Sequence, residues 1–162
     1  MSRIPLGHCA IAIAAALALA QTTAGAESVN ISMPASVLFF VTDVGMSTTG
    51  SPNPTTVSFE SAQLDSGKAL KISVQADAAS FTPPSGMAIP ALNVSWTTSG
   101  AVGGTGSNGT LNASSYNQVY QSFADPSTGS VNITWTLASP GSGIRAGDHT
   151  LTVRWKLESV VP

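Results

Sequence analysis

The chain contains few residues that could do acid–base chemistry, and His149 is the first of them. Asp148 directly precedes it, and a serine–histidine site needs a carboxylate that orients the imidazole. Adjacent residues of a strand point to opposite faces, so Asp148 is poorly placed for this task. No G-x-S-x-G turn accompanies the pair. We therefore expect a turn at 146–148, no catalytic residue and a non-enzymatic protein.

Cofactor and metal chemistry also lack the residues they need. Residues 104–109 read G-x-G-x-x-G, but a dinucleotide site requires a helix to follow, and residues 110–115 are a poor helix opening. We interpret this stretch as a flexible loop. The acidic residues are scattered singly, and the one cysteine is Cys9, so neither a calcium loop nor a cysteine zinc site is predicted. No cofactor and no metal are expected.

Aromatic residues offer a possible surface for sugar binding. Trp96, Trp135 and Trp155, together with Tyr116 and Tyr120, could stack on sugar rings, which keeps an extracellular carbohydrate-binding module as an alternative function. Each tryptophan, however, shares its parity with Val, Ile or Leu of the same segment, so we expect all three on a buried face. Among the N-x-[ST] sequons, those at Asn108 and Asn112 lie in a predicted loop and are the ones open to glycosylation.

The elements that must position these residues are strands. Apolar and polar residues alternate with a period of two in segments 68–76, 93–97, 131–137 and 151–158, and shorter candidates are 56–60 and 116–123. Loops rich in Gly, Pro, Asn and Ser separate them at 45–54, 65–67, 82–86, 99–109, 125–129 and 139–143. Helix is expected only as a turn near 113–116. The pattern predicts an all-β, antiparallel, immunoglobulin-like β-sandwich of about eight strands.

Charge and the first residues indicate where the protein works. Only 9% of the 162 residues are charged and the net charge is -2, which excludes the clustered cations that nucleic-acid binding needs. Arg3, the apolar run 11–20 and Ala24-Gly25-Ala26 are typical of a signal peptide. We expect cleavage near Ala26, so that residues 1–26 are the signal and 27–162 form one secreted domain in the periplasm or at the cell surface. No later segment is long and apolar enough for a membrane span.

The segment after the expected cleavage site has one apolar face for thirteen residues, longer than an ordinary strand. This face consists of Val29, Ile31, Met33, Ala35, Val37, Phe39 and Val41. In one interpretation it is a first strand that kinks at Pro34 and passes from one sheet to the other. In the other it is an assembly strand that completes the open sheet of a like subunit or another cell-surface component by strand addition. The sequence leaves both open.

The C-terminus carries a second apolar alternation. Gly147 precedes Leu151, Val153, Trp155 and Leu157, and Val161 is penultimate. In this closing strand, and in the alternating N-terminal segment, the chain resembles chaperone–usher type pilins and related bacterial coat subunits. It departs from them in having no cysteine pair and no aromatic penultimate residue. The resemblance implies a secreted or surface structural and adhesive subunit that assembles by strand addition.

A further resemblance concerns two W-x-L triplets. Residues 135–137 and 155–157 both read W-x-L, which is similar to WxL cell-wall-binding domains. Those domains normally hold their motifs much further apart, and any strand with two inward residues can produce the triplet. The pilin-like subunit is therefore the favoured function, with the wall-binding and carbohydrate-binding modules as alternatives.

Overall fold

Strands account for nearly all regular structure in the computed structural model, which describes residues 25–162. The expected signal peptide lies outside the described residues except for Gly25 and Ala26. Alternating segments such as 131–137 form strands because one face is buried while the other stays polar. The elements are β1 (Ser28–Ser32), β2 (Thr48–Thr49), β3 (Thr55–Gln63), β4 (Ala69–Ala76), the 3-10 turn η1 (Ala91–Asn93), β5 (Val94–Val102), β6 (Gly104–Gly106), β7 (Gly109–Thr110), β8 (Asn117–Ser122), β9 (Gly129–Leu137) and β10 (Val153–Val160).

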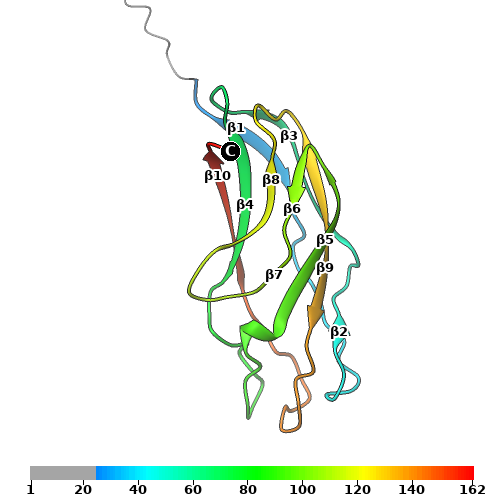
Figure 1. The fold of residues 1–162 in the computed structure, drawn as a ribbon. Helices are drawn as coiled ribbons and strands as arrows, with labels where there is room; N and C mark the ends of the chain where they lie inside the picture. Colours follow the sequence, from blue (N-terminus) through cyan, green and yellow to red (C-terminus); the bar gives the residue numbers. More distant parts are fainter. Residues whose placement is uncertain (1–24) are drawn as a thin grey trace, which may run out of the picture.

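These strands form two antiparallel sheets that pack face to face (Figure 1). One sheet has the order β1-β3-β9-β5-β7, and β2 pairs with β9 next to the start of β3. The other has the order β10-β4-β8-β6. The predicted all-β, antiparallel two-sheet architecture is confirmed. The first and last strands of the chain thus lie at edges of different sheets.

The core lies between the sheets and is built from the alternation seen in the sequence. From one sheet, β9 contributes Val131, Ile133, Trp135 and Leu137, and from the other, β4 contributes Leu70, Ile72, Val74 and Ala76. Polar residues of β9 lie between its buried ones, so that strand has one wet face. This core sets the distance between the two sheets, and the site described below lies between them.

Most of the stretch 99–109 is paired backbone, so the flexible loop expected from the sequence is wrong. Strand β5 continues to Val102, and β6 and β7 pair with β8 and β5. A high glycine content suggests a loop, but glycine also lets side chains pack closely against the backbone. A Cβ on Gly109 would lie 2.5 Å from Cζ2 of Trp96. Residues 111–116, which follow the G-x-G-x-x-G stretch, form no helix, so the part of a dinucleotide site that receives phosphate is missing.

Smaller differences concern the turns. Residues 113–115 bend without forming a helical turn, because Oδ1 of Asn112 accepts hydrogen bonds from the backbone N and the Oγ of Ser114, both at 2.8 Å. The one helical turn within residues 25–162, η1, follows Pro90. Within residues 25–162, no helix is both long and apolar enough to cross a bilayer.

Candidate functional site: the groove between the two edge strands

The N-terminal segment runs along a single sheet. Strand β1 pairs with β3, and beyond Pro34 the backbone N of Leu38 donates to Ser51 O at 2.9 Å, while Ser51 N donates to Leu38 O at 2.8 Å. Ser51 closely follows β2, which belongs to the same sheet. The interpretation in which the strand passes from one sheet to the other is therefore wrong: residues 33–37 leave the ladder and the chain rejoins the same sheet. Proline has no N–H to give to a ladder, which accounts for the interruption.

The apolar stripe of this segment is divided between core and surface. Five of its members are half-buried and pack against the core: Val29, Ile31, Met33, Val37 and Phe39. Ala35 is exposed and Val41 is 37% exposed. Val37 fits because Gly50 faces it, where a Cβ would lie only 2.5 Å from Cγ1 of Val37.

The closing strand β10 has one partner. It pairs with β4 along its whole length, with Trp155 opposite Val74 and Leu157 opposite Ile72. Leu151, just before β10, and Val153, Trp155 and Leu157 are all half-buried against the core. No strand of the described chain pairs with the other edge of β10, so that edge presents unpaired backbone donors and acceptors.

Glu27 joins the two edge strands at one end. Its Oε1 accepts a hydrogen bond from Ser159 Oγ in β10 at 2.7 Å and another from the backbone N of Asp65 at 3.0 Å. These two hydrogen bonds, first that of Asp65 and then that of Ser159, together with nearby Lys68, lower the pKa of Glu27 below its ordinary value. The carboxylate therefore links β10 to the sheet that contains β1.

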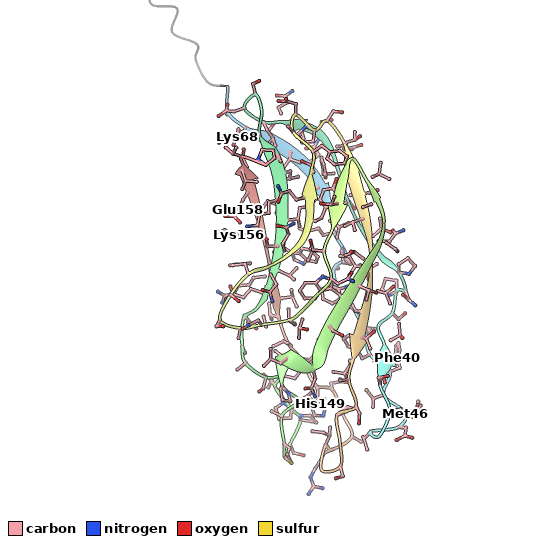
Figure 2. The ribbon with its side chains drawn as sticks, in the orientation of Figure 1. Phe40, Met46, Lys68, His149, Lys156 and Glu158 are labelled. Atoms are coloured by element: carbon pink, nitrogen blue, oxygen red, sulfur yellow. The ribbon has the colours of Figure 1, made fainter. Side chains whose placement is uncertain are left out.

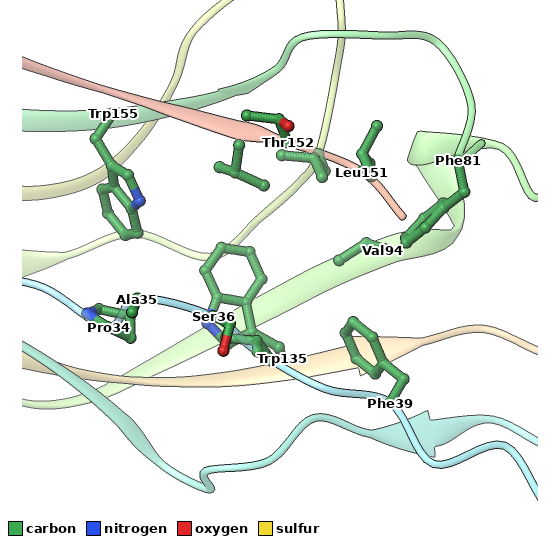
Figure 3. A pocket seen from close by; sticks show the side chains of 13 residues that line it. Pro34, Ala35, Ser36, Phe39, Phe81, Val94, Trp135, Leu151, Thr152 and Trp155 are labelled. Atoms are coloured by element: carbon green, nitrogen blue, oxygen red, sulfur yellow. The ribbon is translucent and has the colours of Figure 1, made fainter. Parts of the chain in front are cut away.

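Toward the other end a cavity opens between residues 34–39 and residues 151–155, and we call it the edge groove. It encloses about 310 Å³. In Figure 3 Trp155 lies across the groove from Trp135, and Phe39 and Phe81 lie toward the opposite end. The groove exists because residues 33–37 on one side and Leu151 and Thr152 on the other belong to no strand, so both walls stand away from a regular ladder.

The tryptophans agree with the sequence analysis at two of three positions. Trp96 is 2% exposed and Trp135 is 5% exposed, and their rings pack with centroids 5.4 Å apart. Trp155 is only half-buried, because one side of it faces the open edge groove. Its parity was predicted correctly, but an edge strand buries less than a central one.

His149 lies among the loops at the far end of the sandwich from the C-terminus (Figures 1 and 2). Its Nε2 donates to the carbonyl oxygen of Arg145 at 2.9 Å, and within the described chain its Nδ1 has no hydrogen-bond partner. A metal site built on three or more His, Cys, Asp or Glu residues is not found within 25–162. The residues that the fold does bring together are the apolar ones at the chain ends.

The sequence analysis missed the exposed apolar residues of the loop that continues from the wall of the edge groove. Phe40 is 69% and Met46 62% exposed (Figure 2), and Leu38 is 53% exposed. The available signal was the run 37–41, in which apolar residues occupy both parities. A strand with one buried face cannot hide both sets.

Comparison with known proteins finds no family model, no curated protein and no solved structure that matches this chain. The features that bear on its function are the edge groove and the strands that flank it.

Proposed function

We propose that this protein is a non-catalytic structural or adhesive subunit of a surface assembly, pilin-like in the sense that subunits join by strand addition. The observation that carries the proposal is the unpaired edge of β10 beside the open edge groove. An extended segment laid along this edge satisfies the free backbone groups of β10 and buries its apolar side chains between the sheets. No observation gives comparable support to the wall-binding or carbohydrate-binding alternatives.

The strand order supports an immunoglobulin-like sandwich with one position empty. In immunoglobulin domains one sheet has the order A-B-E-D, and the other pairs C with F and F with G. Here β1-β3-β9-β5 corresponds to A-B-E-D, and β4 and β10 correspond to C and F. The place of G, next to β10, has no strand from residues 25–162. β8 and β6 extend the other side of β4, away from this gap.

The N-terminal segment has the properties of the strand to be donated. Its apolar residues occur at every second position from Val29 to Val41, as a strand with one buried face requires. Within its own chain, only β1 of this segment forms a ladder, and the ladder has an irregular register between Ser28 and Asn30. A short, interrupted ladder costs less to open than a long regular one, which favours exchange between subunits.

Deleting Glu27–Met33 tests this proposal. We expect the shortened protein to remain a folded monomer that no longer assembles, and a peptide of residues 27–41 to bind it. A peptide with Ile31→Asp and Val37→Asp, which keeps the length but loses the apolar face, is the matched control and should not bind. If the deletion unfolds the monomer and the intact protein stays monomeric at high concentration, the segment is an ordinary first strand and the proposal fails.

A further inference from the structure

Exposed apolar side chains gather on the loop that follows the N-terminal segment. The exposed large hydrophobic residues of this loop are Leu38, Phe40, Val41, Val44 and Met46. Phe40 and Met46 lie toward the end of the sandwich opposite the C-terminus (Figures 1 and 2). Side chains so close together form a patch rather than scattered surface residues, and exposed apolar patches mark contacts with another molecule.

Two further loops share this end of the sandwich with the loop 38–46. The backbone N of Gly141 donates to Val44 O at 2.9 Å. A Cβ on Gly143 would lie 3.1 Å from Sδ of Met87, and Met87 is 62% exposed. The loop that contains Gly141 and Gly143 thus joins the other two. We call the surface formed by loops 38–46, 82–90 and 139–147 the loop face.

The N-terminal segment runs along β10 toward the loop face. Glu27, at its start, accepts a hydrogen bond from Ser159 near the end of β10, whereas residues 34–39 lie across the edge groove from residues 151–155. The segment is therefore antiparallel to β10, and every strand pair within residues 25–162 is antiparallel as well. We expect a segment donated by another subunit to keep this direction, so that its last residues reach the loop face of the acceptor.

The connection behind this segment limits where the donor can lie. Residues 40–47 lead into β2, which pairs with the end of β9, Thr48 opposite Leu137, so β2 begins beside the donor's own loop face. The eight residues of this connection span at most about 26–29 Å when fully extended. A nine-residue strand such as β9 is itself roughly 30 Å long. The donor's β2 must therefore lie near the acceptor's loop face, and the two subunits meet with their loop faces together.

From this geometry we infer that strand addition is reciprocal: two copies of the chain exchange residues 27–39 around a two-fold axis and close into a dimer whose interface is the loop face. The inference rests on the proposed strand addition. After the first exchange the second acceptor is already within reach of its donor, so the second exchange is effectively intramolecular. Exchange of an identical element between two copies is also a low-cost route to a dimer.

The loop face suits contact with a second copy of itself. In a two-fold interface the same patch serves both subunits, so it must be self-complementary. An apolar surface meets this condition, and Phe40, Met46 and Met87 supply it. The charged residues of the loop face are Asp43 and Arg145, one of each sign, so two such faces carry no net charge that would repel them.

Sedimentation velocity of the protein of residues 27–162 at rising concentration tests the closed dimer. We expect monomers and dimers and nothing larger, whereas trimers and longer chains would show one-directional addition and overturn the inference. Binding of the peptide of residues 27–41 to the protein lacking Glu27–Met33 tests the proposed function separately. If the peptide binds while the intact protein stays monomeric or forms long chains, only the reciprocal exchange is contradicted. If the peptide does not bind, strand addition itself is contradicted.

Two exposed phenylalanines at opposite ends of the sandwich locate the interface. Phe40→Ser removes a large apolar side chain from the loop face and should weaken the dimer at least ten-fold, because the burial of that side chain is lost. Phe123→Ser is the matched control and should leave the dimer unchanged. Phe123 is 64% exposed and lies at the other end, where the backbone N of Asp125 donates to Lys68 O at 2.8 Å (Figure 2). Dimers that are insensitive to Phe40→Ser, or that are lost with Phe123→Ser, would contradict an interface at the loop face.

Discussion

Trp135 belongs both to the core of the sandwich and to the wall of the edge groove. One side of its ring packs against Trp96, and other parts of the residue line the cavity. A residue with two such roles can change the stability of the fold and the properties of the groove at once. Experiments at this position must therefore measure folding and binding separately.

Replacing Trp135 with alanine should cost about 3–5 kcal/mol in the free energy of unfolding, as large-to-small changes of buried aromatic residues do. Denaturant unfolding measures this change. The matched control is Phe40→Ala: Phe40 is 69% exposed, so its truncation should stay within about 0.5 kcal/mol. Equal effects of the two substitutions would mean that Trp135 is not a core residue.

The hydrogen bonds of Glu27 should make the stability of the fold depend on pH. The pKa of Glu27 is lower in the folded protein than its ordinary value of 4.5. Its contribution is therefore fully present above pH 4.5 and is lost as the pH falls through the lowered folded pKa. Glu27→Gln should reduce stability at pH 7, and the difference from the unaltered protein should shrink as the pH falls from about 5 toward 3.

The measurement for Glu27 is the unfolding midpoint of both proteins across this pH range. Glu60→Gln, at an exposed position on β3, is the matched control for removing a carboxylate. A difference between Glu27→Gln and the unaltered protein that stays constant down to pH 3 would show that the link to Ser159 and Asp65 does not form in solution.

Among the elements, the long strands of the core could be predicted from the sequence. In β4 and β9 every second residue is apolar, and this alternation is typical of a strand with one buried face. The bounds expected for these strands, 68–76 and 131–137, differ from the observed ones by no more than two residues. The pairing of β10 with β4 could not be predicted, because alternation specifies a buried face but not a neighbour.

The glycine-rich strands could not be predicted for a different reason. A sequence does not distinguish a glycine that gives a loop its freedom from a glycine that lets a large side chain approach the backbone. Gly109 is of the second kind, since Trp96 lies over it. The edge groove could not be predicted either. Its walls contain residues that belong to no strand, and the space between them depends on how the two sheets pack.

Substituting Gly109 with alanine tests this interpretation of the glycine-rich strands. The added Cβ would lie 2.5 Å from Cζ2 of Trp96, so the ring or β7 must move, and we expect a loss of about 1–3 kcal/mol in the free energy of unfolding. Gly45→Ala, where the added carbon would meet only Oδ1 of the exposed side chain of Asp43, at 3.2 Å, is the control. If Gly109→Ala is as stable as the control, the contact between β7 and Trp96 is not tight.

For the molecule as a whole, the start of the described chain and the C-terminus lie at the same end of the sandwich (Figure 1). Glu27 joins the edges of both sheets at one end, and the edge groove separates them toward the other. Low charge fits the proposed role in packing, because a chain in which 9% of the residues are charged offers little electrostatic repulsion to like subunits. The edge of β10 is the place where the fold has room for one more strand.

Amide hydrogen exchange along β10 tests strand addition most directly. The protein lacking Glu27–Met33 is mixed with the peptide of residues 27–41, and exchange is followed for residues 153–160. Strand addition predicts slowed exchange at every second amide of β10, those that do not already donate to β4, and no slowing with the Ile31→Asp, Val37→Asp peptide. Exchange along β10 that is unchanged by the apolar peptide would contradict strand addition at this edge.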